Sequence, residues 1–291
     1  MVRLHFIKPG LWTTVQDNGR IGYQNFGVPV GGVMDKKAAQ QANQLVGNSL
    51  ETPILEITML GPQIIFQGDC QIAITGADLS PTLNKQPISN YETIHVSSNS
   101  VLAFGQLRQG CRTYLAVRGQ WKIKPWLGSC SAMPFGDKTA TPQSLIQKDS
   151  FIDVQTLPLI APQRTALEDR PVFKKIVKIA LMAGPEWNYL TLRQVAHLFS
   201  TTYKIHKDSN RMGYRLDPSL PNFEFSSPLI SSGIVPGTVQ VTNEGQLIIL
   251  LLDAQTMGGY PRIGNITQDA INNLAQAKPG DSIRFEFKED K

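Results

Sequence analysis

The sequence has few cysteines and no long apolar run, and both absences narrow the class of protein. Only three cysteines occur in 291 residues and no two have CxxC spacing, so neither a disulfide framework nor a zinc knuckle is expected. The longest apolar run, 247–252, is far shorter than the ~20 residues that cross a bilayer. The N-terminus carries Arg3 and Lys8 without an apolar signal-peptide core. We therefore expect a cytoplasmic protein without a membrane partner.

Several familiar catalytic motifs are also missing. The chain contains no GxxxxGK[ST] phosphate loop, no GxGxxG, no HExxH pair and no GxSxG nucleophile elbow. Its four histidines are dispersed, so no histidine metal site is expected. The net charge of +5 is not gathered into a basic stripe with interleaved aromatics, which argues against nucleic acid as a partner. Small anions, such as a carboxylate or a phosphate, suit this charge.

The chain instead contains many short segments that are typical of strands. They are rich in Val, Ile, Leu, Thr and Phe, and Gly, Pro, Asn and Asp separate them. Such spacing predicts a mainly β fold built from barrels or sandwiches. The clearest expected strands are 63–66, 71–75, 93–96, 101–104, 113–117, 176–182, 237–241, 246–252 and 282–287.

Only three segments are expected to be helical. Asp35 is placed to cap a helix over 36–45 that ends near Gly47. Segment 190–199 has apolar residues at 192, 195, 196 and 199, which form one helical face. A third helix over 270–277 begins after a cap at Thr267 or Asp269.

A proline-containing stretch without strand periodicity divides the chain. It covers 157–170, and a fresh strand follows it. We therefore predict an N-terminal domain over 1–165 and a C-terminal domain over 166–291, each with many strands and one or two helices.

Two Gly-rich segments of the N-terminal half concentrate polar groups. In 13–22, Arg20 has the geometry to grip an anion, and Gln16 and Asp17 have groups that orient a substrate amide or a water. A hairpin in which Asp17 and Arg20 simply pair explains this segment equally well. Segment 27–35 enters a helix and resembles an anion-binding turn, but Asp35 is in the first place a helix cap.

Two further segments of this kind lie in the C-terminal half. In 209–216, Arg211 and Arg215 project to one side if the chain is extended, which suits a carboxylate or phosphate. Two surface arginines beside a turn are an equally good interpretation. Asp253 and Gln255 follow the most apolar strand, and a carboxylate at the end of a buried strand needs partners. We interpret this fourth segment as part of a site, although turn N–H groups alone could satisfy Asp253.

These segments together resemble the biotin-dependent carboxyltransferase-like family, also called the allophanate hydrolase subunit 2 or KipA family. Within it, the similarity is greatest to the C subunits of 5-oxoprolinases. The resemblance extends in consistent order over most of the chain. Its main motifs are GLWTTVQDNGRIGYQNFGVPVGGVMD at 10–35, ITGAD at 74–78, YLAVRG at 114–119, SNRMGYRL at 209–216, SSGIVPGTVQV at 231–241 and DAQTMGGYPRIG at 253–264.

The resemblance implies two cyclophilin-like β-barrel domains with a few short helices. It also implies a hetero-oligomer with the KipI-like B subunit of a 5-oxoprolinase and a functional link to its A subunit. The implied reaction is the ATP-dependent hydrolysis of 5-oxo-L-proline to L-glutamate, with ATP and Mg²⁺ as cofactors. Because this chain has no familiar nucleotide motif, either an atypical Gly-rich site holds the nucleotide or the partner subunit supplies much of that site.

For such a reaction we expect polar groups from both halves to meet at one pocket that grips a small anion. The expected catalytic residues are Asp17, Arg20 and Asp253. The expected substrate-binding residues are Gln16, Asn210, Arg211, Arg215, Gln255 and Tyr260. Asp17 or Asp253 would orient water or magnesium, and no metal site made by this chain alone is expected.

Two other functions are compatible with the same resemblance. One is the carboxyltransferase component of a urea carboxylase-like biotin enzyme, with biotin carried by another protein. The other is a KipA-type regulatory binding protein that antagonises a kinase inhibitor.

Overall fold

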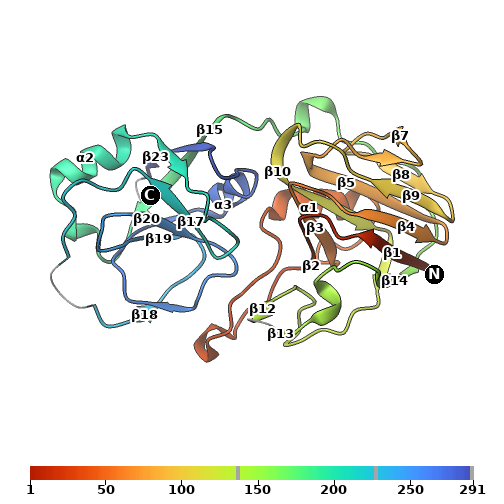
Figure 1. Cartoon of the computed structure of the whole chain (residues 1–291), viewed down its shortest axis with the longest axis horizontal. Helices are drawn as coiled ribbons and strands as arrows, with labels where there is room; N and C mark the ends of the chain where they lie inside the picture. The colour runs from red at the N-terminus through yellow and green to blue at the C-terminus, as the bar shows by residue number, and fades with distance from the viewer. Residues whose placement is uncertain (136–137, 226–228, 289–291) are drawn as a thin grey trace. The chain divides into compact units, whose positions relative to one another are not determined.

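The computed structural model describes residues 1–135, 138–225 and 229–288 and confirms the predicted mainly β fold with few helices (Figure 1). All nine expected strands are present as strands. The chain forms two compact units. The N-terminal unit comprises residues 1–20 and 31–173, and the C-terminal unit comprises residues 21–30 and 174–291.

The N-terminal unit contains a seven-stranded antiparallel sheet in the order β11-β14-β1-β4-β9-β6-β7. Its strands, in chain order, are β1 (Val2–Lys8), β4 (Gln63–Gln67), β6 (Thr82–Leu83), β7 (Gln86–Pro87), β9 (Ser100–Ala103), β11 (Gly119–Trp121) and β14 (Ser150–Thr156).

A second, five-stranded antiparallel sheet has the order β2-β3-β10-β5-β8. Its strands are β2 (Trp12–Gln16), β3 (Ile54–Thr58), β5 (Cys70–Asp78), β8 (Thr93–Val96) and β10 (Gln109–Val117). A short ribbon, β12 (Pro134–Phe135) with β13 (Lys138–Thr139), and two 3-10 turns, η2 (Pro142–Ser144) and η3 (Leu167–Asp169), complete the described elements of this unit.

Both sheets contribute to one apolar core. On β1, the alternate residues Val2, Leu4 and Phe6 are fully buried, as the two-residue period of a strand requires. They join Leu55 and Leu115 of the five-stranded sheet in the same cluster. The opposite face of the five-stranded sheet is covered by helix α1 (Lys36–Leu45), which has the predicted bounds. This second face also carries the row of Thr14, Glu56 and Tyr114 that is described below.

The C-terminal unit is built on a closed barrel of seven strands in the order β15-β22-β19-β20-β17-β16-β23. Neighbours are antiparallel except β15 and β23, which pair in parallel and close the barrel. The strands are β15 (Ile176–Ala183), β16 (Tyr203–Ile205), β17 (Gly213–Asp217), β19 (Thr238–Val241), β20 (Leu247–Leu250), β22 (Arg262–Ile266) and β23 (Ser282–Phe287). A ribbon of β18 (Ser232–Gly233) and β21 (Met257–Gly258) and the 3-10 turns η1 (Gln24–Phe26) and η4 (Trp187–Tyr189) accompany it.

Two helices of this unit begin at side-chain caps. Helix α2 (Leu192–Ser200) starts with a capping box of Thr191 and Gln194. Helix α3 (Gln268–Leu274) is capped by Thr267, whose side chain accepts a hydrogen bond from the Ala270 N–H, so the first of the two predicted caps is correct. No described helix is both long and apolar enough to cross a membrane.

Candidate functional site

Asp17 lies just beyond β2 and binds a serine-containing loop. Its carboxylate accepts hydrogen bonds from the hydroxyls of Ser129 (2.5 Å) and Ser131 (2.6 Å). It also accepts from the backbone N–H groups of Gly19 (2.9 Å) and Cys130 (2.6 Å). Four donors are close to the capacity of a carboxylate. Asp17 therefore fixes the 129–131 loop against the end of β2.

Arg20 binds the same loop from a buried position. Its side chain is 1% exposed, and its Nη2 donates to the carbonyl oxygen of Ser131 at 2.5 Å. The guanidinium lies over the ring of Trp126, 5.1 Å from the ring centroid. Sequence reasoning singled out Asp17 and Arg20 but missed Trp126, Ser129 and Ser131, because these residues are more than a hundred positions away in the chain.

The Gly-rich turn packs closely onto Asp17. The Val33 N–H donates to the carbonyl oxygen of Asp17 at 2.9 Å. A Cβ atom on Gly32 would lie 2.9 Å from that same oxygen, and Gly32 has a φ of +90°. Both facts require glycine at this position.

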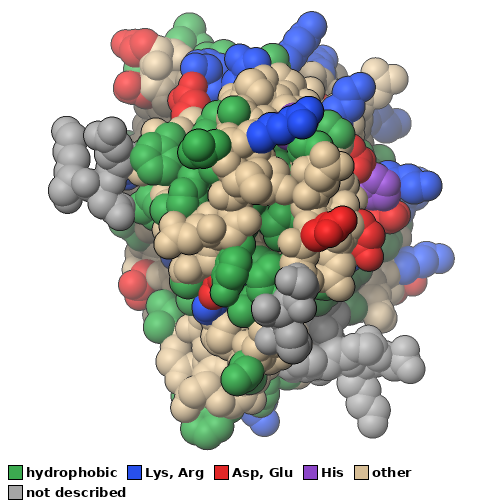
Figure 2. All heavy atoms as spheres, turned by 90° about the vertical axis from the view of Figure 1, so that its left-hand side faces the viewer, with side chains coloured by type: hydrophobic (Ala, Val, Ile, Leu, Met, Phe, Trp, Pro, Cys, Tyr) green, Lys and Arg blue, Asp and Glu red, His purple; other side chains and the backbone are tan. Residues whose placement is uncertain are grey.

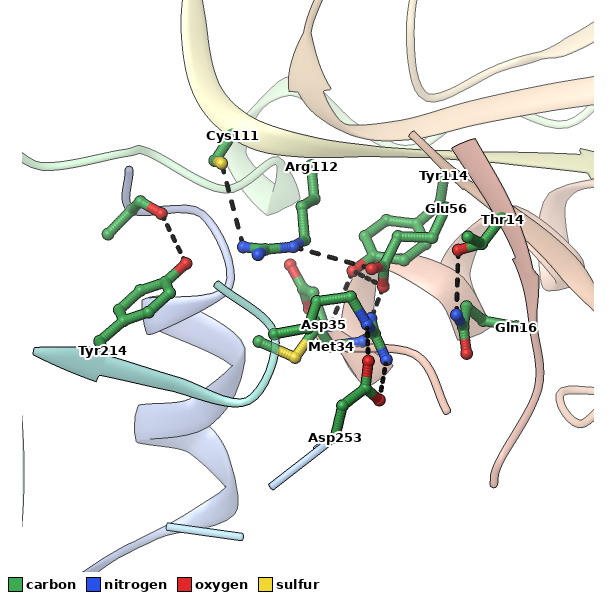
Figure 3. A network of polar contacts seen from close by, with 12 residues as sticks. Thr14, Gln16, Met34, Asp35, Glu56, Cys111, Arg112, Tyr114, Tyr214 and Asp253 are labelled. Atoms are coloured by element: carbon green, nitrogen blue, oxygen red, sulfur yellow. Dashed lines mark hydrogen bonds and ion pairs between the residues drawn. The ribbon is translucent and has the colours of Figure 1, made fainter. Parts of the chain in front are cut away.

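The buried carboxylate of Glu56 binds the backbone just before α1 (Figure 3). Its Oε2 accepts from the Met34 N–H (2.8 Å) and from the Tyr114 hydroxyl (2.9 Å). The Tyr114 oxygen in turn accepts from the Asp35 N–H, and the Asp35 side chain accepts from the Ala38 N–H. The helix-cap interpretation of Asp35 is thus confirmed. The anion-site interpretation is wrong for these three N–H groups, because protein oxygens already accept their hydrogen bonds.

This network forms one row across the five-stranded sheet. Thr14, Glu56 and Tyr114 are directly opposite one another on β2, β3 and β10. Arg112 Nε lies 3.7 Å from Glu56 Oε1, and both side chains are buried. Burial, and secondarily the charge of Glu56, raises the pKa of Tyr114 well above its usual value, so the tyrosine keeps the proton that it donates. The sequence signal that could have found this row is a glutamate within the apolar strand 54–58.

Gln16 lies on the same face of β2 as Thr14 and is 1% exposed. Its Nε2 donates to the Thr14 hydroxyl at 2.9 Å, as Figure 3 shows. Its Oε1 has no hydrogen-bond partner among the described residues. A buried amide oxygen without a protein partner calls for a water or a ligand donor.

In the C-terminal unit, Arg211 and Asp253 form a bidentate ion pair (Figure 3). Arg211 Nε is 2.7 Å from Asp253 Oδ2, and Nη2 is 2.9 Å from Oδ1. Arg211 is 7% exposed, and the Asp253 N–H donates to the Arg211 carbonyl oxygen at 3.1 Å. Such parallel contacts are among the strongest polar interactions in proteins. The two residues therefore act as one unit.

Arg215 has a different environment. It lies on β17 and is exposed, whereas Arg211 precedes that strand in a bend, so the extended geometry that would place both on one side is not present. Arg215 Nη1 donates to the amide oxygen of Gln246 at 3.0 Å, and no described carboxylate pairs with it. Asn210 is exposed, and its Oδ1 accepts from the Met212 N–H at 2.7 Å.

A second bidentate pair holds the other end of the segment that begins at Asp253. Arg262 donates from Nε (2.9 Å) and Nη2 (2.8 Å) to the carboxylate of Glu186, and from Nη1 to the Gly233 carbonyl oxygen (3.1 Å). These hydrogen bonds are the main reason that the pKa of Glu186 is lowered. Sequence reasoning missed both residues, although Arg262 lies within the motif 253–264.

The segment 253–262 is thus anchored by an arginine–carboxylate pair at each end. The predicted residues Gln255 and Tyr260 lie between these anchors and are exposed. The carbonyl oxygen of Tyr260 accepts a hydrogen bond from the buried Gln240 at 3.4 Å. The segment therefore presents an amide and a phenol from a backbone that is fixed at both ends.

These residues do not fit a magnesium site made by this chain. No group of three or more His, Cys, Asp or Glu side chains with the spacing of a metal site occurs among the described residues. Asp17 already accepts four hydrogen bonds, and both oxygens of Asp253 are bound by Arg211. The predicted convergence of residues from both halves on one ligand stays a prediction.

Comparison with known proteins gives a consistent picture. The family model for the carboxyltransferase domain, subdomains A and B, matches residues 26–287. The chain is 34% identical to the C subunit of the Escherichia coli 5-oxoprolinase, over 97% of this chain and 90% of that protein.

Two solved structures have similar folds. The Kluyveromyces lactis urea carboxylase has a TM-score of 0.89 and 29% identity, over 97% of this chain and 27% of that one. The protein TTHA0988 has a TM-score of 0.84 and 26% identity, over 98% of this chain and 55% of that one. The chain thus spans about half of TTHA0988 and about a quarter of the urea carboxylase.

Proposed function

The chain belongs to the family of carboxyltransferase domains with subdomains A and B, and on this basis we propose that it is the C subunit of an ATP-dependent 5-oxoprolinase. It would form a hetero-oligomer with a B-type subunit, and the pair would act with an A-type subunit. The complex would hydrolyse 5-oxo-L-proline to L-glutamate.

The observation that carries this proposal is the higher sequence identity to a 5-oxoprolinase subunit. The chain is 34% identical to the C subunit of the Escherichia coli 5-oxoprolinase, over 97% of this chain. Its identity to the urea carboxylase, over the same share of this chain, is lower at 29%. The C subunit is therefore the better counterpart.

The chemistry of the C-terminal unit suits a small anionic amide. Arg215 brings a positive charge that no described carboxylate neutralises, which suits the substrate carboxylate. Gln255 and Tyr260 offer exposed hydrogen-bonding groups on the anchored segment, which suit the amide. The Arg211–Asp253 pair would position this segment, since Asp253 begins it. Fixed donors stabilise developing charge better than mobile ones.

ATP supplies the energy to open an unreactive lactam, but the described residues of this chain do not provide a Mg²⁺ cage. We therefore place the nucleotide and its metal mainly with the partner subunit. In this arrangement the chain would contribute substrate binding and orientation, and no step of the nucleotide chemistry is assigned to it.

The experiment is reconstitution from the purified A, B and C subunits of one organism with ATP, Mg²⁺ and 5-oxoproline. Glutamate is measured by chromatography, and each subunit is omitted in turn. We expect glutamate only when this chain is present. Equal glutamate formation without the chain, or none from the complete assembled mixture, would overturn the proposal and favour a regulatory binding role.

A second function has specific support in the TM-score of 0.89 with a urea carboxylase. In that case the chain would transfer a carboxyl group from carboxybiotin, carried by another protein, to urea. Incubation with a carboxylated biotin carrier and urea separates the two functions. We expect no urea-dependent loss of the carboxyl group from the carrier.

A further inference from the structure

The β18–β21 ribbon covers the outside of the barrel at β20. All four residues of β20 are buried, although one face of a strand in a closed barrel points outward. The outward residues belong to a small apolar cluster, which consists of Ile234, Ile248, Leu250 and Ala254. Two members of this cluster come from the segments 229–236 and 253–262, which contain β18 and β21. These two segments therefore pack on the barrel as a layer of their own.

The ribbon carries charges only at its two anchors. Asp253 and Arg262 form the ion pairs described above, and no other residue of 229–236 or 253–262 is charged. Figure 2 views the C-terminal unit from outside, and its surface below the middle, at the height where Figure 1 labels β18, carries mostly uncharged side chains. The ribbon therefore offers a ligand neutral hydrogen-bonding groups. Such groups bind only in well-aligned directions, so the backbone between the anchors must be held in place.

Gln240 lies beneath this backbone. It is on β19, opposite Ile248 of β20 and Arg262 of β22, and it is 1% exposed. Side chains that are directly opposite on neighbouring strands share a face, so Gln240 points outward with Ile248, toward the ribbon. Its Nε2 donates to the carbonyl oxygen of Tyr260 at 3.4 Å. The register of β19 and β22 shifts just before Gln240, and such bulges often re-aim side chains beside active sites.

The absence of a side chain at Gly258 makes room for the Gln240 amide. A Cβ atom on Gly258 would lie 2.8 Å from Gln240 Nε2 and 3.3 Å from Ile234 Cδ1. A glycine in a strand often marks such a close approach. On the next residue, Gly259, a Cβ atom would meet its nearest neighbour at 3.5 Å, which is an ordinary contact. Gln240 thus supports the turn 258–260 in two ways, by filling the space under Gly258 and by its hydrogen bond to Tyr260.

We propose that Gln240 is a positioning residue that sets where Tyr260 presents its phenol to the lactam of the substrate. This inference rests on the proposed function, which places Tyr260 against the substrate amide. Gln240 itself does not touch the substrate. It fixes the middle of the segment 253–262, whereas the two ion pairs fix its ends. A misplacement of about 1 Å in such a contact costs up to about 100-fold in rate.

The test uses the assembled A, B and C subunits with Gln240→Met in this chain. Methionine keeps the length of the side chain and removes the donor. We expect the KM for 5-oxoproline to rise about 10-fold and the KM for ATP to stay at the wild-type value, since the nucleotide is placed with the partner subunit. A loss of folded protein alone would lower the maximal rate and leave both KM values unchanged. The two KM values therefore separate positioning from stability.

Thr238→Val is the matched control. Thr238 is a buried polar residue two positions before Gln240 on the same face of β19. Its hydroxyl donates to Asn265 Oδ1 at 3.0 Å and accepts from the Val235 N–H at 3.3 Å, so it makes no hydrogen bond to the segment 253–262. Thr238→Val should lose about as much stability to urea as Gln240→Met does, with both KM values unchanged.

A second pair of variants tests the contact under Gly258. Gly258→Ala should raise the KM for 5-oxoproline, because the new methyl group displaces the Gln240 amide, which is the end of a flexible side chain. In a Gln240→Ala background the same substitution should add little, because the displaced group is gone. Equal effects of Gly258→Ala in the two backgrounds would exclude this contact as the cause.

Hydrogen–deuterium exchange of this chain by itself gives a readout that needs no activity. The amides of 257–260 should exchange faster in Gln240→Met than in the wild type, and at the wild-type rate in Thr238→Val. Unchanged exchange in Gln240→Met, or a wild-type KM for 5-oxoproline in its active complex, would overturn the inference. Absence of glutamate from the wild-type complex would instead refute the proposed function, and the exchange rates would still decide whether Gln240 holds the turn.

Discussion

Arg211 and Asp253 share two nearly parallel hydrogen bonds of 2.7 and 2.9 Å although they are distant in the sequence. The pair joins the bend before β17 to the start of the segment 253–262. Because both side chains are mostly buried, loss of either partner leaves a charge without its counterion in a poorly solvated place. The pair therefore couples the stability of the C-terminal unit to the geometry of its candidate site.

A double-mutant cycle measures this coupling. We expect Arg211→Met and Asp253→Leu each to destabilise the protein by about 3 kcal/mol, and the double variant by much less than the sum. Urea denaturation gives the unfolding free energies. Arg3 and Asp153 have the same bidentate geometry on the surface, and their cycle should show a much smaller coupling. Additive effects at Arg211 and Asp253 would exclude this coupling.

Asp17 is expected to matter for stability through the 129–131 loop. Asp17→Ala leaves two serine hydroxyls and two backbone N–H groups without their acceptor, so we expect a loss of about 3 kcal/mol in unfolding free energy. Glu168→Gln, at an exposed residue of η3, is the control and should change little. If Asp17→Ala has the same midpoint of urea unfolding as the wild type, the loop does not depend on this carboxylate.

Glu186 should make stability depend on acid pH. Its pKa is lowered in the folded protein, chiefly by hydrogen bonds from Arg262. A lowered pKa adds stability that is complete above the unfolded value of 4.5 and is lost as the pH falls through the folded value.

We therefore expect Glu186→Gln to cost about 2 kcal/mol at pH 7 and to lose less stability than the wild type between pH 5 and pH 3. Urea denaturation over this pH range is the measurement. Parallel pH profiles of the two proteins would exclude the ion pair as the cause.

Cys130 should react slowly with thiol reagents in the native protein. Burial, with a smaller contribution from the charge of Asp17, raises the pKa of the Cys130 thiol to about 11 from 9.0. Since the thiolate is the nucleophile, reaction with an aromatic disulfide at pH 8 should be about 100-fold slower than in denatured protein. Asp17→Ala should accelerate it, because the loop that buries the thiol loosens.

The sequence predicts local structure well where one pattern dominates. Short runs of Val, Ile, Leu, Thr and Phe between Gly, Pro, Asn and Asp located nine strands of the two units. Asp35 and Thr267 located helix starts because capping depends only on neighbours. Helix α2 was predicted as a helix, but the face that it buries was not, because the apolar stripe at 192, 195, 196 and 199 resembles any core-facing stripe. Only the packing of Gln194 and Leu198 reveals which face is inside.

The residues of the candidate site were also predicted only where a local signal marks them. Asp253 and Arg211 were singled out from their surroundings in the sequence, but their pairing depends on how β17 and β20 meet in the barrel. Glu186 and Arg262 were missed for the same reason: neither is unusual until the fold brings a carboxylate to a guanidinium. Glu56 had a local signal, a charge inside an apolar strand, and this signal alone could have identified it.

The decisive measurement is the rate of glutamate formation by the assembled A, B and C subunits when the C subunit carries Asp253→Asn. We expect the wild-type complex to form glutamate from 5-oxoproline. The variant, once shown to fold and to bind its B-type partner, should be slower by about 100-fold, as expected when a positioned polar group is lost. A folded, assembled variant that forms glutamate at the wild-type rate would contradict the role given to the anchored segment.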